Sequence, residues 1–70
     1  NPTDGNVSID LGNTYTSVLV NLLDLNGKVI QSRTYNNSQV LSVQIEYPAG
    51  VYLLVIESGN RKAAIQLVKK

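Results

Sequence analysis

The chain has 70 residues, of which 43% are hydrophobic and 16% charged, so it predicts one small folded domain rather than a disordered tail. Six Lys and Arg residues against five Asp and Glu residues give a formal net charge of +1, which argues against a strongly charged partner such as nucleic acid. The absence of Cys and His removes disulfides, thiolate zinc sites and the commonest catalytic base. No run approaches the roughly 20 apolar residues of a membrane-spanning helix, so no span is expected.

The first half of the chain predicts three strands. Val7–Leu11 alternates between apolar and polar residues, the period of a half-buried strand, and Leu11-Gly12-Asn13 then offers a turn. Tyr15–Leu23 is apolar on both faces, which is typical of a central strand covered on both sides. Asn26-Gly27 tolerates the positive φ values of a type I′ turn, so Lys28–Tyr35 is expected to return as a hairpin partner.

The second half predicts three more strands. A loop at Asn36-Asn37-Ser38 precedes Val40–Ile45, which alternates again. Val51–Ile56 is continuously apolar and indicates a second central strand. After a turn at Gly59-Asn60, Ala63–Val68 places apolar residues at alternate positions.

Short strands at close, regular spacing predict an all-β fold. We expect a small immunoglobulin-like antiparallel β-sandwich of six to seven strands, forming a single domain over residues 1–70. If its last strand is paired in a sheet, the C-terminus is held at a fixed place on the surface.

Two turn motifs have sufficient structural explanations. In Pro48-Ala49-Gly50-Val51-Tyr52, the proline fixes φ, the glycine accepts a conformation that other residues resist, and the tyrosine begins the next strand. A tyrosine after such a turn is similar to the tyrosine corner of immunoglobulin-like sandwiches, where the hydroxyl bonds nearby backbone. Asn1-Pro2-Thr3-Asp4-Gly5 is likewise interpreted as a turn at the start of the domain.

The C-terminal residues carry most of the positive charge. Arg61, Lys62, Lys69 and Lys70 are four of the six basic residues, and no acidic residue follows Glu57. This distribution predicts a locally positive tip, which is either a recognition feature or simply a solvated charged terminus.

Catalytic and cofactor chemistry find no support in the sequence. The five carboxylates fall on separate predicted strands and turns, so no catalytic pair is expected. They are Asp4, Asp10, Asp24, Glu46 and Glu57. Asp24-x-Asn26-Gly27 lacks the remaining ligands of a calcium loop, which favours a plain hairpin. We therefore expect no enzyme activity, no cofactor, no metal site and no nucleic-acid partner.

The ordered set of motifs resembles the type A C-terminal sorting domain of the type IX (Por) secretion system, found at the ends of secreted proteins in the Bacteroidetes. The resemblance covers essentially the whole chain and rests on four features. These are Asn1-Pro2-x-x-Gly5, the turn at Asn26-Gly27, Pro48-x-Gly50-x-Tyr52 and the terminal Lys69-Lys70. Gln66 stands where a further lysine is common in the family.

The resemblance implies a folded secretion signal at the C-terminus of a cargo protein, so the chain is expected to be a fragment of a longer secreted protein. Its implied partners are the type IX translocon, a sortase and the cargo. The cargo would pass through the periplasm, cross the outer membrane, lose the domain to the sortase and be joined to lipopolysaccharide at the cell surface. Translocon recognition is implied for the basic residues Arg61, Lys62, Lys69 and Lys70.

Two alternatives belong to other classes. The first is an immunoglobulin- or fibronectin-like binding module of an extracellular enzyme, for which Tyr15, Tyr35 and Tyr47 are the plausible contact residues. Clustering of these tyrosines on one flat face would favour it, whereas dispersal or burial would weaken it. The second is weak dimerisation through the edge of the last strand, which has few charges within it.

Overall fold

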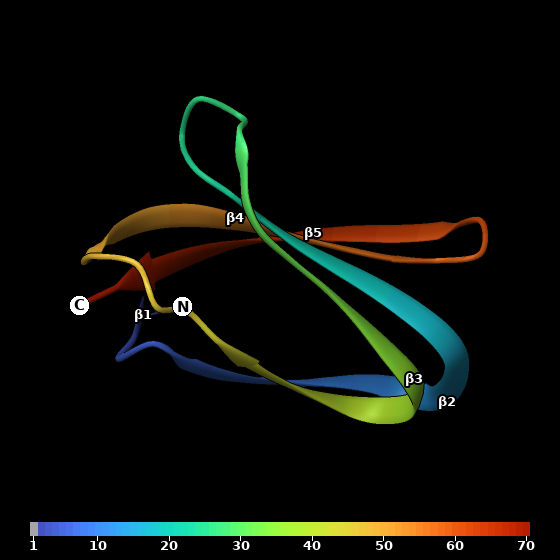
Figure 1. Ribbon diagram of the computed structural model, residues 1–70. Helices are drawn as coiled ribbons and strands as arrows, with labels where there is room; N and C mark the ends of the chain where they lie inside the picture. The colour runs from blue at the N-terminus through green and yellow to red at the C-terminus, as the bar shows by residue number, and fades with distance from the viewer. Residues whose placement is uncertain (1) are drawn as a thin grey trace.

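The computed structural model describes residues 2–70 and is built of β-strands. The strands are β1 (Pro2–Thr3), β2 (Asn6–Leu23), β3 (Val29–Gln44), β4 (Gly50–Ser58) and β5 (Arg61–Lys69). They form one sheet in the order β1-β5-β4-β2-β3, in which β1 runs parallel to β5 and the other neighbours are antiparallel (Figure 1). The predicted all-β class is confirmed. The expected number of six to seven strands is not confirmed, because residues 2–70 form five strands. The immunoglobulin-like architecture is not confirmed either.

The strand count differs because β2 and β3 each join two of the strands predicted separately. The pairing register of β2 with β3 shifts between Asp10 and Tyr15, the signature of a bulge or irregularity. Gly12 and Asn37 lie in this region with φ values of 82° and 49°. The turn expected at positions 11–13 and the loop expected at 36–38 are therefore bends within continuous strands.

The bend folds the single sheet over itself. Asn6–Asp10 of β2 pairs with Val40–Gln44 of β3, and this ribbon lies below the β4–β5 hairpin in Figure 1. The remaining part of β2 pairs with β4 on one side and with β3 on the other. The core fills the space between these layers. Its buried members are Val18, Val20, Leu22, Leu41, Val43, Ile45, Tyr52, Leu54, Ile56 and Leu67.

The β2–β3 hairpin is confirmed, but its turn has a different geometry from the one expected. The amide of Gly27 donates to the carbonyl of Asp24 at 3.0 Å, and Gly27 has a positive φ of 81° whereas Asn26 does not. A type I′ turn needs positive φ at both positions, so this turn is a type I turn followed by a left-handed glycine. The Asp24 carboxylate accepts hydrogen bonds from the amides of Asn26 and Lys28, so it stabilises the turn.

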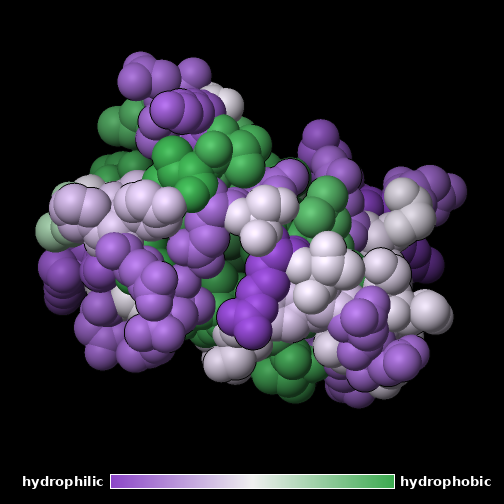
Figure 2. Space-filling view, viewed as in Figure 1, coloured by the Kyte–Doolittle hydropathy of each residue, from purple (hydrophilic) through white to green (hydrophobic). Residues whose placement is uncertain are grey.

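One flank between the layers is closed by side chains that cross from one half of bent β3 to the other. Tyr35 donates from its hydroxyl to the Ser42 carbonyl at 2.8 Å, and Gln31 donates from Nε2 to the Gln44 carbonyl at 2.9 Å. Tyr47 also donates from its hydroxyl to a carbonyl of β3. We call this side the latched flank. In Figure 2, hydrophilic residues cover most of the face shown, and hydrophobic residues gather at the base of the β2–β3 turn.

No helix long and apolar enough to cross a membrane occurs in residues 2–70.

Candidate functional site: the C-terminal strand and its anchor

β5 separates the four basic residues that the sequence places near one tip. Arg61 and Lys62 begin the strand, whereas Lys69 ends it and Lys70 follows. Nine residues of extended chain span about 26 Å, at about 3.3 Å per residue. The two pairs therefore lie at opposite ends of the molecule, beside the β4–β5 turn and beside the C-terminus (Figure 1).

The first pair has partners within the domain. Arg61 donates from Nη1 to the Tyr15 hydroxyl at 3.1 Å, and its guanidinium carbon lies 5.9 Å from the centre of the Tyr15 ring. Lys62 Nζ lies 3.4 Å from Glu57 Oε1, in a pair whose side chains are 67% and 40% exposed. Such an exposed pair is screened by water and holds its side chains weakly, so the Lys62 ammonium stays accessible.

Lys69 is directed inwards. Its Nζ donates hydrogen bonds to the carbonyls of Ile45 at 2.9 Å and Tyr47 at 2.6 Å, and both bonds are partly buried. Hydrogen bonds from an ammonium group are among the stronger ones in proteins. We call Gly5, Ile45, Tyr47 and Lys69 the lysine anchor, because this contact ties the last strand to the segment between β3 and β4. Of the two terminal lysines, Lys69 is half-buried and Lys70 is exposed.

Gly5 completes the anchor from the N-terminal side. It has a φ of +122°, and the Ile45 amide donates to its carbonyl at 2.7 Å. A Cβ at this position would lie 3.1 Å from the Ile45 carbonyl oxygen and 3.2 Å from Lys69 Cε, closer than most side chains tolerate. The glycine is therefore required both for its backbone conformation and for the space that the Lys69 side chain occupies. The expectation of a structural role for this motif fits these contacts; Asn1 lies outside the described residues.

The C-terminus is held by main-chain pairing as well. β1 pairs with β5 through Pro2 opposite Val68 and Thr3 opposite Lys69, and the Lys70 amide donates to the Thr3 carbonyl at 2.8 Å. The last strand is thus paired almost to its final residue.

The tyrosine corner predicted from the Pro48-x-Gly50-x-Tyr52 motif is present. Tyr52 is 8% exposed, and its hydroxyl donates to the Pro48 carbonyl four residues upstream. The prediction that Gly50 adopts a conformation that other residues resist is wrong. Its φ is not positive, and a Cβ there would meet the Tyr52 ring at an ordinary 3.8 Å. Proline and tyrosine, rather than the glycine, therefore define this turn.

Replacing Tyr52 by phenylalanine tests the corner. The loss of one partly buried hydrogen bond is expected to reduce the free energy of unfolding by about 1 kcal/mol. Urea denaturation followed by circular dichroism measures this, with Tyr35→Phe as the matched control. The Tyr35 hydrogen bond is exposed, so its loss should cost less. Equal costs for the two variants would contradict a special role for the corner.

Three of the four sequence motifs therefore meet at one end of the molecule, whereas the Asn26-Gly27 turn lies elsewhere, between β2 and β3. Residues 3–5, 45–52 and 67–70 lie together at that end, beside β1 and the C-terminus (Figure 1). Sequence reasoning identified Lys69 but not its acceptors, the carbonyls of Ile45 and Tyr47. No sequence signal could have found these acceptors, because every residue carries a carbonyl.

The tyrosines do not form an exposed platform. Tyr15, Tyr35 and Tyr47 are half-buried and pack against the core. The hydroxyl of each also has a hydrogen-bond partner within the domain. By the criterion of dispersal or burial, this arrangement weakens the alternative of a binding module.

The carboxylates likewise stay apart. Within residues 2–70, no three His, Cys, Asp or Glu side chains come together as a metal site would need. Asp4 and Asp10 accept hydrogen bonds from the backbone amides of Asn6 and Gly12, two residues further on. Their roles in this structure are those of turn-forming residues.

The fold and the lysine anchor define a small all-β domain. The contacts of its terminal motifs hold the last strand in a fixed position. The whole chain, residues 1–70, matches the family described as the secretion system C-terminal sorting domain. The chain belongs to this family, and is thus a C-terminal sorting signal of type IX secretion, which directs export across the outer membrane towards the cell surface or the medium. Membership implies interaction with the type IX machinery and a cargo, and the family is not one of enzymes. No curated protein and no solved structure matches the chain.

Proposed function

We propose that the domain is recognised in the periplasm by the type IX translocon of a Bacteroidetes bacterium. After the cargo has crossed the outer membrane, a sortase removes the domain and joins the cargo to the cell surface. The observation that carries this proposal is the match of the entire chain to the sorting-domain family. The anchored terminus supports it, because a signal recognised in folded form needs its contact residues at fixed positions.

In this proposal the four basic residues have two different roles. Lys70, Lys62 and Arg61 contact the translocon, since Lys70 is exposed and the Lys62 side chain is 67% exposed. Lys69 acts as a positioning residue, because its ammonium is already bonded to the carbonyls of Ile45 and Tyr47. Gly5 and Tyr52 maintain the end of the domain on which Lys70 lies.

Fusing the 70 residues to the C-terminus of a fluorescent reporter, in a Bacteroidetes host with an intact type IX system, tests the function. We expect reporter at the surface or in the medium with the domain removed. Replacing Lys70 by glutamine should reduce export several-fold while the thermal midpoint of the purified domain changes little, because the side chain is exposed and the substitution keeps the Lys70 amide that donates to the Thr3 carbonyl.

Lys28→Gln is the matched control, because Lys28 is an exposed lysine at the β2–β3 turn, far along the chain from the terminus. Its export should equal that of the parent. Retention of the parent reporter in the periplasm, where an established sorting domain exports the same reporter, would overturn the proposed function. Full export of the Lys70→Gln variant would exclude Lys70 from the recognition site.

A further inference from the structure

We propose that the type IX machinery binds this domain by strand addition, with an extended segment of the partner, aliphatic at alternate positions, pairing along the free edge of β5. The proposal rests on the proposed function and names its mode of recognition. The segment would lie in a groove of about 480 Å³ between β5 and the first half of β2. We call this the β5 groove; it is lined by Thr3, Asn6, Val7, Ser8, Ile9, Asp10, Ile65 and Leu67.

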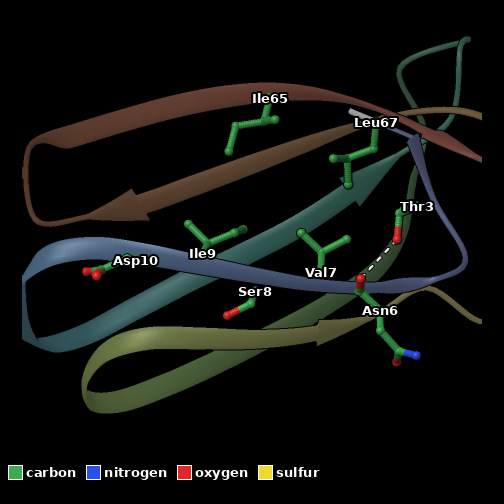
Figure 3. A pocket seen from close by; sticks show the side chains of 8 residues that line it. All are labelled: Thr3, Asn6, Val7, Ser8, Ile9, Asp10, Ile65 and Leu67. Carbon is green, nitrogen blue, oxygen red and sulfur yellow. Dashed lines mark hydrogen bonds between the residues drawn. The ribbon is translucent and has the colours of Figure 1, made fainter.

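The groove has strands as its walls, and aliphatic side chains of both walls face each other across it. In Figure 3, Ile65 and Leu67 of β5 point towards Val7 and Ile9 of β2; the one charged residue that lines the groove is Asp10. Leu67 is buried, but the other three aliphatic side chains are only half-buried and pack against the core from its margin. A volume of this size falls within the range of about 300–1,000 Å³ found for ligand sites.

The free edge of β5 follows from its pairing with β1. Among residues 2–70, β1 covers only Val68 and Lys69 on this side, and the Lys70 amide points towards it to reach Thr3. Backbone groups along a strand alternate in direction, so the amides of Lys62, Ala64 and Gln66 point to the same side as that of Lys70. The register of β4 with β5 is continuous from Gly50 to Ser58, so this alternation is not interrupted. Three amides with their carbonyls are thus directed to the groove side.

The opposite wall shows the same property. The Ile45 amide bonds the Gly5 carbonyl, so the main chain of odd-numbered residues in this part of β2 faces β3. That of Asn6, Ser8 and Asp10 faces the groove side, where the Asn6 carbonyl accepts the Thr3 hydroxyl at 2.9 Å. The latched flank has three side chains closing the gap between layers. The described contacts cross this flank at its two ends, through Thr3 and Asn6 beside β1 and through Arg61 and Tyr15 beside the β4–β5 turn.

The chemistry of the partner follows from the residues beside the edge. Pairing with Arg61–Leu67 places alternate partner side chains against the aliphatic interior of the groove, which favours Val, Ile or Leu at every second position. The other partner side chains lie beside the exposed outer face of β5, where Lys62 is already paired with Glu57 of β4 at 3.4 Å, so this face does not require a charged partner. Ala63–Leu67 also carries no charge that would repel an added strand. β1 already pairs with the end of this edge, which shows that it accepts a parallel strand.

The test replaces the outward-facing amide of Ala64. Ala64→Pro removes one donor from the free edge without removing a bond to β4, because proline is tolerated at strand edges when its position faces solvent. Ala64→Val keeps the amide and is the matched control. We expect the reporter carrying Ala64→Pro to be exported at least tenfold less than the parent, with Ala64→Val exported normally and both purified domains folded by circular dichroism.

Export of Ala64→Pro at the level of Ala64→Val would overturn the proposal. If Ala64→Pro does not fold, Gln66→Pro makes the same test at the next outward amide. A measurement on the parent needs no variant: amide hydrogen exchange of the domain mixed with purified type IX translocon should slow at Lys62, Ala64 and Gln66 but not in Val29–Arg33 at the other edge. Slowing at β3 instead, or none, would also overturn it.

Two further outcomes separate this proposal from others. Failure of the parent reporter to reach the surface contradicts the proposed function itself, whereas export of the parent and of Ala64→Pro alike contradicts only strand addition. A second copy of the chain could occupy the same edge. A parent dimer by light scattering that Ala64→Pro converts to a monomer, with export unchanged, would assign the groove to self-association and overturn the proposal.

Discussion

Replacing Lys69 by methionine is expected to lower the free energy of unfolding by about 2 kcal/mol, since hydrogen bonds to charged groups contribute about 1.5–3 kcal/mol. The variant keeps a long apolar side chain but leaves the partly buried carbonyls of Ile45 and Tyr47 without their donor. In a domain of this size, a loss of 2 kcal/mol lowers the thermal midpoint by about 10 °C. Thermal unfolding followed by circular dichroism measures it.

Lys70→Met is the matched control, because it removes an adjacent charge whose side chain is exposed. We expect a change within about 0.5 kcal/mol for that variant. Lys69→Arg should recover only part of the loss, because the guanidinium is larger and planar and the space beside Gly5 is filled by Lys69 Cε. Equal stabilities of the Lys69→Met and Lys70→Met variants would show that the anchor does not stabilise the fold.

The anchor changes how the terminal lysines are interpreted. Deleting Lys69 and Lys70 together removes an exposed charge and a stabilising contact at once. Lost export would then report either lost recognition or an unfolded signal. Lys70→Gln separates the two effects, because the Lys69 contacts with Ile45 and Tyr47 and the hydrogen bond from the Lys70 amide both remain.

The faces of the strands could be predicted from the sequence, whereas the bends could not. In the segment Val40–Ile45, the alternation predicts that Leu41, Val43 and Ile45 share one face, and all three are buried. The same pattern cannot distinguish a loop from a bend, because Gly12 and Asn37 supply positive φ values equally well in either. Whether a strand ends or bends depends on its partner bending with it, and that is a property of pairing rather than of local sequence.

The candidate site was predictable only in its residue types. The sequence indicated that Lys69 and Gly5 matter, but not that they touch, since 64 positions separate them along the chain and the contact depends on β1 lying beside β5. The direction of Lys69 was equally hidden, because a long flexible side chain at a strand end can face solvent or fold inwards. The sheet order decides between these.

Gly5→Ala is expected to be the most destabilising single substitution among these motifs, at about 3 kcal/mol. A φ of +122° is one that side chains rarely adopt, and the added methyl group would lie 3.1 Å from the Ile45 carbonyl oxygen, which is main chain and cannot move aside cheaply. Domains of this size have a total stability of only about 3–5 kcal/mol, so much of the variant should be unfolded. Urea denaturation and the fraction of native circular dichroism signal measure this.

Gly12→Ala separates the two causes of the expected loss. Gly12 also has a positive φ, 82°, but a Cβ there would meet nothing within 4 Å. It should therefore cost only the conformational strain, about 1 kcal/mol. In a Lys69→Ala background, where the 3.2 Å contact with Lys69 Cε is gone, Gly5→Ala should cost less than in the parent, because the two substitutions act on the same contact. Equal costs at Gly5 and Gly12, with no coupling to Lys69, would mean that the glycine serves the turn alone. The predicted coupling would instead show that Gly5 and Lys69 act through one contact, which holds the first and last strands of the sorting signal beside each other.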